Sequence, residues 1–223
     1  MDWLGLAAGD SVLDLGCGGG RNLLGLARRG IVGAGVDVGP YPVQIARESL
    51  APYPMKIMLA DMRASVPSGP FDAAVCLYGQ ITTFPVDEAL AILQNTAKAL
   101  APGGQLVLEL YLGPAMLDAL ESMESWTVTD RWMTGEYPQL VLDEHYVNWD
   151  AAEYVRTSWV IAMEDQGRNL EMVRQGSVIY DAQSLRGLLE LAGFELTTLY
   201  GDYEGSEFDE DSVNMIAVAR RYM

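Results

Sequence analysis

The chain has 223 residues, and its 14 lysines and arginines against 31 aspartates and glutamates give a formal net charge of −17 at pH 7. Phosphate-rich partners require clustered cations, so this charge excludes nucleic acid and argues against an anionic membrane surface. Half of the residues are hydrophobic and 20% are charged, a balance that excludes a disordered polyampholyte and favours a single folded domain, 1–223.

The sequence also bears on the compartment in which the protein works. No run of 18 or more apolar residues occurs, so we expect no membrane-spanning helix. The first residues have neither a basic segment nor a long apolar one, which is unlike a secretory signal. Cys17 and Cys76 lack the spacing of a metal or redox pair and are interpreted as reduced thiols. We therefore expect a cytoplasmic protein without a bound metal.

The first half, 1–112, alternates short apolar runs with helical patterns. Five strands are predicted, at Ser11–Leu15, Val32–Val38, Met55–Leu59, Asp72–Leu77 and Gln105–Tyr111. Helices are predicted at Asn22–Arg29, from Pro42 to about Leu50, and at Glu88–Leu100, with Asp87 as the N-cap of the last. Nearly all-apolar strands that alternate with helices indicate an α/β fold with a parallel sheet covered on both faces.

The second half is built differently. Four long segments with period-2 alternation predict an antiparallel β-meander inserted at about 126–180: Trp126–Met133, Leu140–Trp149, Tyr154–Met163 and Leu170–Tyr180. The region 181–223 then returns to the first pattern, with a helix at Ala182–Leu191 that Asp181 caps and Gly193 ends. Two further strands, Leu196–Gly201 and Asn214–Arg221, are joined by an acidic loop.

The negative charge is concentrated in the second half. Residues 1–112 carry seven basic and ten acidic groups, whereas residues 113–223 carry seven and 21, which gives net charges of −3 and −14. If the second half selects the substrate, a neutral or cationic small molecule is favoured over an anionic one. The alternative is a solvated acidic surface of the kind found in salt-adapted proteins.

The most informative segment is Val12–Arg21, VLDLGCGGGR. Here a strand leads into a turn with Gly16, Gly18 and Gly20, and a helix follows. Glycines allow a sharp turn and close approach of a ligand, and the helix N-terminus offers free N–H groups. Position 21 is arginine, so the dinucleotide pattern G-x-G-x-x-G fails at its last glycine. Asp14 is placed at the strand end, where it can help to receive an ammonium group.

Acidic residues also follow the next two strands. Asp37 lies 21 residues after Gly16, where a carboxylate can accept both hydroxyls of a ribose. Asp61 can accept a hydrogen bond from an adenine amino group, and Met62 can pack on the ring. All of these positions lie at the carboxyl ends of parallel strands, where open α/β sheets bind their ligands.

These motifs resemble those of class I S-adenosylmethionine-dependent methyltransferases. The resemblance covers about residues 9–112 and rests on Val12–Arg21, Asp37, Asp61-Met62, Phe71–Leu77 and Leu100–Leu110. It implies a Rossmann-like doubly wound sheet of seven strands with the last strand antiparallel. The implied cofactor is S-adenosylmethionine, with S-adenosylhomocysteine as the product.

The resemblance also implies roles for individual residues. Asp14, Gly16, Gly18 and Gly20 would cradle the methionine part, Asp37 would hold the ribose, and Asp61 and Met62 the adenine. Leu77 would offer its carbonyl to the cofactor's amino group, and Cys17 and Val38 complete the expected cofactor contacts. The predicted meander is similar to the β insertions of some small-molecule N- and O-methyltransferases. The Asp/Asn-Pro-Pro-Tyr/Phe motif of N6-adenine methyltransferases is absent.

The resemblance is incomplete at the start of the chain. Most members of that family place a helical segment before the first strand, whereas here that strand begins about ten residues in. Either the start has been shortened, or the insertion or a second subunit covers the site.

Three residues are candidates for catalysis. Methyl transfer from a sulfonium is an in-line displacement that depends on positioning and on exclusion of water, and a base helps when the nucleophile is protonated. Tyr78 and Gln80 follow the fourth predicted strand, and His145 is the chain's one histidine. Tyr78 could instead be a packing residue at the pocket rim, and His145 an ordinary strand residue. The aromatic meander fits a sheet core or a homodimer interface better than a cation-binding cage.

Three functions are compatible with these motifs. We favour a methyltransferase that acts on a small molecule, with no nucleic acid or membrane as partner. The second is an enzyme that uses the same cofactor site for another reaction, such as cyclisation of the cofactor or a cyclisation that it assists. The third is a non-catalytic binder of the cofactor or its product.

Overall fold

A computed structural model describes residues 5–110, 114–121, 123–129, 139–164, 167–209 and 211–223. Its seven-stranded sheet consists of β1 (Ser11–Leu15), β2 (Val32–Asp37), β3 (Met55–Leu59), β4 (Phe71–Cys76), β5 (Leu100–Leu110), β10 (Phe194–Tyr200) and β11 (Met215–Arg221). The strand order is β10-β11-β5-β4-β1-β2-β3. β11 runs antiparallel to both of its neighbours, and the pairs among β1 to β5 are parallel. The predicted doubly wound sheet with an antiparallel last strand is therefore confirmed.

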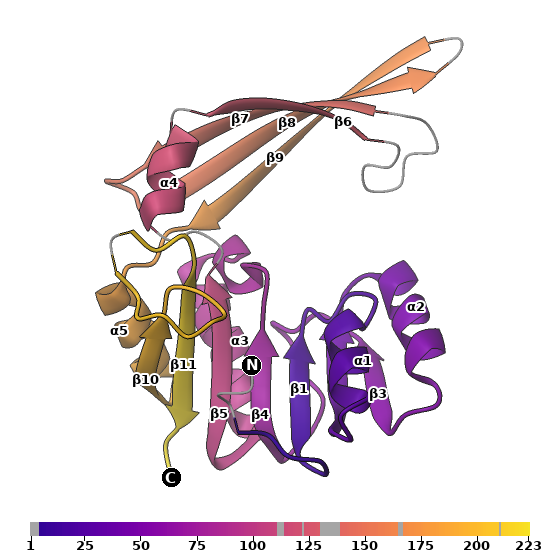
Figure 1. Cartoon of the computed structure of the whole chain (residues 1–223), viewed down its shortest axis with the longest axis vertical. Coiled ribbons are helices and arrows are strands. Elements are labelled where there is room, and N and C mark those ends of the chain that lie inside the picture. The colour runs from indigo at the N-terminus through magenta and orange to yellow at the C-terminus, as the bar shows by residue number, and fades with distance from the viewer. Residues whose placement is uncertain (1–4, 111–113, 122, 130–138, 165–166, 210) are drawn as a thin grey trace.

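Helices cover both faces of this sheet (Figure 1). α3 (Val86–Ala99) and α5 (Ala182–Ala192) pack against each other, and α1 (Arg21–Ala27) packs against α2 (Pro40–Leu50). The largest apolar cluster joins α3 and α5 to alternate residues of the strands, such as Leu13 and Leu15 of β1. Val12, the residue before Leu13, belongs to a separate cluster on the opposite face. Because both faces of the sheet are covered, the central strands are apolar at most of their positions.

A second, four-stranded antiparallel sheet has the order β6-β7-β8-β9. Its strands are β6 (Glu124–Thr129), β7 (Gln139–Asn148), β8 (Glu153–Glu164) and β9 (Gly167–Val178). The sheet lies across the carboxyl-end edge of the parallel strands, with α4 (Pro114–Glu121) beneath it (Figure 1). Leu117 and Leu120 of α4 pack against Val147 and Tyr154 on the inner face of the sheet.

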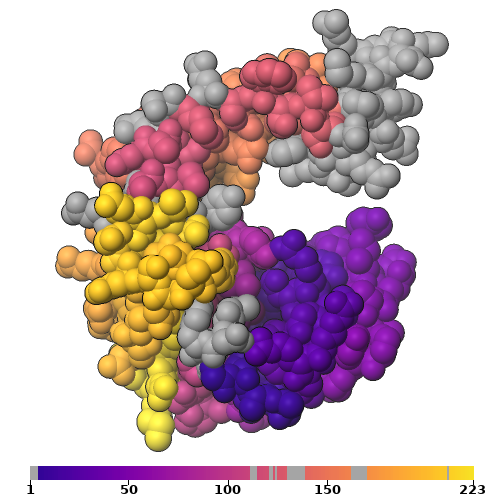
Figure 2. Space-filling model, in the orientation of Figure 1, coloured from indigo at the N-terminus to yellow at the C-terminus, as the bar shows by residue number. Residues whose placement is uncertain are grey.

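The outer face of the second sheet carries a row of apolar side chains, most of them exposed. Trp126, Leu142, Trp159 and Met172 form one cross-strand row, and three of them are exposed large hydrophobic side chains: Trp126, Leu142 and Met172. Figure 2 shows the molecule hollowed between this sheet and the α1–α2 end of the core. No helix in the described part of the chain is long and apolar enough to cross a membrane.

Several local predictions can be checked against these elements. Asp181 caps α5 as predicted, because its Oδ1 accepts the Ser184 N–H at 2.7 Å, and Gly193 ends the helix in a left-handed conformation. Asp87 as an N-cap is wrong: Pro85 is the cap residue, and Asp87 lies in the first turn of α3. A carboxylate there still interacts favourably with the helix dipole. α4 was not predicted, and positions 130–133 of the expected Trp126–Met133 strand lie outside the described residues.

Candidate active site

The glycine turn after β1 is tied to β2 by its own backbone. The N–H groups of Gly16 and Cys17 donate to the carbonyl of Val36 at 2.9 and 3.1 Å. A Cβ on Gly20 would come within 2.9 Å of Leu50, so this glycine allows α1 and α2 to pack closely. A Cβ on Gly18, at a φ of +52°, would meet nothing within 4 Å. Gly18 therefore faces open space from which a ligand can approach the turn.

Asp14 is a buried carboxylate with unused hydrogen-bonding capacity. Its side chain is 1% exposed, and among the described residues nothing donates to its Oδ2. Burial, reinforced by the charge of Asp37, raises the pKa of Asp14 to about 7. A buried polar atom without a partner is costly, so this oxygen is suited to receive a donor from a ligand, above all an ammonium group.

Asp37 stands at the end of β2 beside the glycine turn. Its Oδ2 accepts the N–H of Gly18 and its Oδ1 accepts the N–H of Gly39, both at 2.8 Å. These bonds fix the carboxylate at the sheet edge. A carboxylate has about four acceptor positions, so the two oxygens can also accept the hydroxyls of a ribose.

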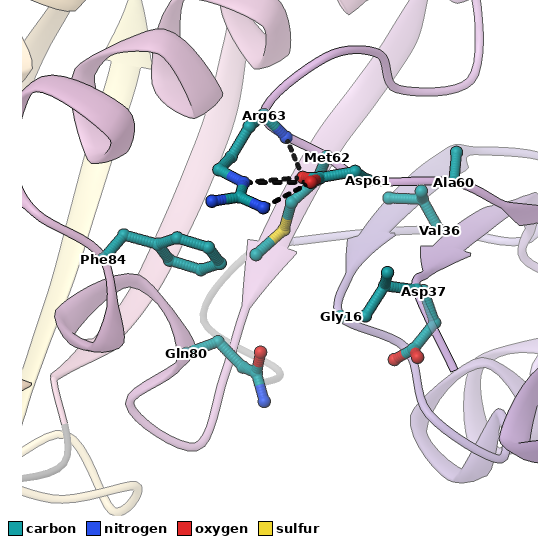
Figure 3. A pocket seen from close by; sticks show the side chains of 10 residues that line it. Gly16, Val36, Asp37, Ala60, Asp61, Met62, Arg63, Gln80 and Phe84 are labelled. Carbon is teal, nitrogen blue, oxygen red and sulfur yellow. Dashed lines mark hydrogen bonds and ion pairs between the residues drawn. The ribbon is translucent and has the colours of Figure 1, made fainter. Parts of the chain in front are cut away.

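A first cavity of about 100 Å³ opens beside this carboxylate (Figure 3). It is lined by Gly16, Val36, Asp37, Val38, Ala60, Asp61, Met62, Arg63, Gln80 and Phe84. The side chains of Met62 and Phe84 point into it, and Asp37 lies at its opposite side (Figure 3). Apolar side chains with a carboxylate at one side form a site that fits an aromatic base attached to a sugar.

Asp61 is engaged by a residue that the sequence did not single out. Its carboxylate accepts three hydrogen bonds of 2.6 to 3.0 Å from the guanidinium of Arg63, which also binds Glu88 at 2.8 Å. The Arg63 hydrogen bonds hold the pKa of Asp61 below its ordinary value. The same guanidinium lies over the ring of Phe84, 5.8 Å from its centre. Asp61 as an acceptor for an adenine amino group stays a prediction, with part of its capacity already used.

A second cavity, of about 450 Å³, lies between the inner face of the second sheet and the core. Its wall toward the core and α4 is formed by Tyr78, Gly79, Thr82, Thr83, Met116 and Leu120. The sheet contributes Ser125, Asp143, His145, Tyr154, Arg156, Gln175 and Ser177. The strand register explains this set, because His145, Arg156 and Gln175 form one cross-strand row and Tyr154 pairs with Ser177.

The predicted catalytic residues divide between the two cavities. Tyr78 and His145 line the second cavity, whereas Gln80 lines the first. Tyr78 adopts a left-handed conformation with φ 58°, and its hydroxyl and ring contact the guanidinium of Arg21. Residues 78–80 thus form the boundary between the cavities.

His145 is held by one neighbour and has a free nitrogen. Its Nδ1 lies 2.7 Å from the hydroxyl of Tyr154, and its buried Nε2 has no partner among the described residues. Burial lowers the pKa of His145 below its ordinary value, although the nearby charge of Asp143 acts in the opposite direction. The imidazole is therefore neutral at pH 7 and able to accept a proton.

Two expected cofactor contacts lie beneath the surface. Cys17 is buried against Gly35, and burial raises the pKa of its thiol to about 12, so it acts as a small packing residue. The carbonyl of Leu77 accepts the N–H of Gln80 at 3.4 Å, which leaves it a second lone pair for a ligand. Val38, in contrast, is 71% exposed at the rim of the first cavity.

The charged side chains among the described lining of the second cavity form an ion pair. The guanidinium of Arg156 donates two hydrogen bonds of 2.9 Å to the carboxylate of Asp143, which Ser158 also binds at 2.6 Å. The described carboxylates of the acidic loop line neither cavity; they are Asp202, Glu204, Glu207, Asp209 and Asp211. Among the described residues of the second half, Asp143 is the one carboxylate that lines either cavity.

Comparison with known proteins finds relatives of the parallel half. Residues 12–104 match the family model described as "Methyltransferase domain". A ubiquinone biosynthesis O-methyltransferase of Xanthomonas oryzae pv. oryzae is 34% identical over 105 residues, which cover 45% of this chain and 43% of that protein. The match thus spans less than half of that relative's length.

Solved structures cover almost the whole chain. An S-adenosylmethionine-dependent methyltransferase from Clostridium acetobutylicum matches with a TM-score of 0.79 at 11% identity, over 96% of this chain and 85% of its own. The sugar N-methyltransferase KedS8 from a Streptoalloteichus species matches with a TM-score of 0.75 at 23% identity, over 96% and 81%. These matches show that the chain shares the fold of these solved proteins over almost its whole length.

Proposed function

We propose that this chain, whose residues 12–104 match a methyltransferase domain, transfers the methyl group of S-adenosylmethionine to a small molecule. The observation that carries the proposal is the position of residues 78–80. Gln80 lines the cavity beside Asp37, and the adjacent Tyr78 and Gly79 line the cavity under the second sheet. Two ligands bound in these cavities would meet at this loop.

The first cavity and the glycine turn offer the groups that the cofactor requires. Asp14 would pair with its ammonium, Asp37 with its ribose hydroxyls, and Val38 and Met62 would pack on its adenine. When bound, the cofactor supplies a methyl group on a positively charged sulfur. The protein then has to orient the acceptor, exclude water and receive a proton.

The second cavity fits an acceptor that combines apolar and hydrogen-bonding surfaces. Met116 and Leu120 form an apolar wall, and hydroxyl, amide and imidazole groups face them from the sheet. The charged pair Asp143–Arg156 is internally balanced. These features support a neutral acceptor, or a cationic one that loses its proton before transfer. The relative from Xanthomonas is named as an O-methyltransferase and KedS8 as a sugar N-methyltransferase, which supports an oxygen or nitrogen nucleophile.

We assign His145 as the general base that accepts the proton of the methyl acceptor. Its Nε2 is free, and its lowered pKa keeps it neutral at pH 7. Tyr78 would close the cavity on the side of the cofactor and shield the reacting atoms from water. Gln80 would orient the cofactor from above the glycine turn.

We also infer the setting in which the chain works. The described part of the chain includes two buried free thiols, Cys17 and Cys76, which support a reducing, cytoplasmic compartment. The exposed apolar side chains on the outer face of the second sheet, Trp126, Leu142 and Met172, support a homodimer. Light scattering after size-exclusion chromatography measures the mass in solution directly.

The function is tested by product analysis with S-adenosylmethionine and a panel of amines, phenols, sugars and acids. S-adenosylhomocysteine that forms only when an acceptor is present supports methyl transfer. Methylthioadenosine released without an acceptor would instead indicate cyclisation of the cofactor. Binding of S-adenosylhomocysteine without any turnover would indicate a cofactor binder.

A further inference from the structure

The boundary between the two cavities has an unfavourable backbone conformation. Tyr78 and Gly79 are consecutive left-handed residues, with φ 58° and φ 64°. A glycine adopts this conformation freely, whereas a bulky residue such as tyrosine is strained in it. Such strain persists only where the surroundings hold the residue in place, so the structure should contain a restraint on Tyr78.

Glu109 of β5 provides that restraint. Its side chain is 4% exposed, and its Oε2 accepts the N–H of Tyr78 at 2.8 Å. Its own backbone carbonyl accepts the N–H of Gly79 at 3.1 Å. A single residue thus binds both N–H groups of the left-handed pair.

Tyr203 completes the arrangement from a distant part of the chain. Its hydroxyl donates to the same Oε2 of Glu109 at 2.6 Å, across 94 positions of sequence. The turn that presents it is held by Asp202, whose Oδ1 accepts the N–H groups of Gly205 and Ser206 at 2.9 and 3.0 Å. The acidic loop between β10 and β11 therefore reaches the candidate site through one phenol.

We propose that Glu109 and Tyr203 are positioning residues for methyl transfer: together they hold Tyr78 and Gly79 at the boundary where the acceptor meets the cofactor. This inference rests on the proposed function. Neither side chain is assigned a contact with a ligand, so both act through the loop. The buried carboxylate is itself stabilised by the two donors, because an ionised buried group needs hydrogen bonds.

The test combines a local measurement with a kinetic one. Amide hydrogen exchange at Tyr78 and Gly79, followed by NMR, reports the restraint without requiring turnover. Tyr203→Phe removes one hydroxyl from a half-exposed side chain, and we expect at least fivefold faster exchange at these two amides with unchanged exchange in α3 and α5. Tyr222→Phe, at an exposed tyrosine near the end of the chain, is the matched control and should leave both amides unchanged.

The kinetic measurement separates positioning from binding. We expect Tyr203→Phe to lower kcat at least fivefold and to change the KM for S-adenosylmethionine less than twofold. Glu109→Ala should have a larger effect on exchange, and Glu109→Gln should rescue part of it, because an amide oxygen can still accept both bonds. If Glu109→Ala does not fold, Tyr203→Phe alone decides.

Failure of the positioning role can be distinguished from failure of the proposed function. Unchanged exchange at Tyr78 and Gly79 in Tyr203→Phe, or faster exchange with unchanged kcat, would overturn the positioning role while wild-type methyl transfer stands. Absence of any S-adenosylhomocysteine binding by the wild-type chain would overturn the proposed function, whatever the exchange data show.

Discussion

Gln80 lies directly over Gly16: a Cβ built on Gly16 would come within 3.0 Å of the Oε1 of Gln80. The turn after β1 and the loop after β4 are therefore in contact across the first cavity, which both residues line. Gly16 also has a φ of +70°, which favours glycine. Both the backbone conformation at position 16 and the close approach of Gln80 therefore require a glycine there.

Gly16→Ala is expected to weaken binding of S-adenosylhomocysteine at least tenfold, or about 1.4 kcal/mol. The added methyl would displace Gln80 and impose a strained backbone. Gly25→Ala is the matched control, because a Cβ there meets nothing within 4 Å and the residue lies in α1. That control should keep its affinity and gain about 0.5–1 kcal/mol in unfolding free energy. Isothermal calorimetry and chemical denaturation measure the two quantities, and equal affinities of the two variants would contradict the placement of the cofactor.

Asp37→Ala should also weaken cofactor binding at least tenfold, about 1.4 kcal/mol, because the ribose hydroxyls lose their acceptor. Asp72→Ala is a comparable change elsewhere, since Asp72 accepts two hydrogen bonds of 2.8 Å from Ser11. Calorimetry should show weaker cofactor binding for Asp37→Ala and unchanged binding for Asp72→Ala. Unchanged affinity of Asp37→Ala would show that the cofactor site is wrongly assigned.

The raised pKa of Asp14 makes cofactor binding depend on pH. Without ligand the carboxyl group is half protonated near pH 7, and pairing with an ammonium requires its ionised form. Affinity for S-adenosylhomocysteine should therefore fall about tenfold for each pH unit below 7, and binding should release a proton. Calorimetry in buffers of different ionisation enthalpy measures the proton count. Asp14→Asn should bind more weakly at pH 8 and lose most of this pH dependence.

The same group affects the stability of the free protein in the opposite sense. The pKa of Asp14 is raised on folding, so the folded state binds more protons than the unfolded state between about pH 4 and pH 7. Its contribution to the free energy of unfolding is favourable at low pH and is lost as pH rises toward 7. Asp14→Asn should consequently be more stable than wild type at pH 8, with a difference that shrinks toward pH 4. A difference that is constant with pH would contradict the raised pKa.

His145→Gln is expected to lower kcat at least tenfold, because the variant lacks the base that accepts the proton of the methyl acceptor. Binding of S-adenosylhomocysteine should be unchanged. Since the pKa of His145 is lowered, the wild-type rate should fall only when the pH drops below about 6.5. Tyr146→Phe changes the next residue of β7, which points to the exposed outer face, and should have no effect. Steady-state rates between pH 5.5 and 8.5 provide the comparison, and an equal rate in His145→Gln would remove this residue from the mechanism.

The parallel half of the fold could be predicted because its signals are local. Each buried strand is a short apolar run, and Asp14, Asp37 and Asp61 were proposed as cofactor contacts from their positions near the ends of such runs. Their roles toward the cofactor stay predictions. The antiparallel sheet was also recognisable from period-2 alternation. Asp87 was misassigned because Pro85, with its fixed φ, already ends the extended segment before α3.

The features that were missed depend on contacts between distant segments. α4 has only eight residues, and its apolar side chains are buried only when the chain folds, against Val147 and Tyr154 of distant strands. The local sequence therefore gives a weak signal for this helix. In the sequence Glu109 is a single polar residue in an apolar strand. Its role becomes visible only in the fold, where Tyr78 and Tyr203 both donate hydrogen bonds to its carboxylate. The charge of the second half favoured a neutral or cationic acceptor over an anionic one, with a solvated acidic surface as the alternative. Among the described residues of that half, Asp143 is the one carboxylate that lines the second cavity, and it is paired with Arg156.

The most direct test of the account is a crystal structure of the chain with S-adenosylhomocysteine. We predict the amino group at Asp14, the ribose at Asp37, and the adenine between Val38 and Met62, with the sulfur facing Tyr78. A ligand bound elsewhere, or bound with its sulfur turned away from the second cavity, would contradict the account.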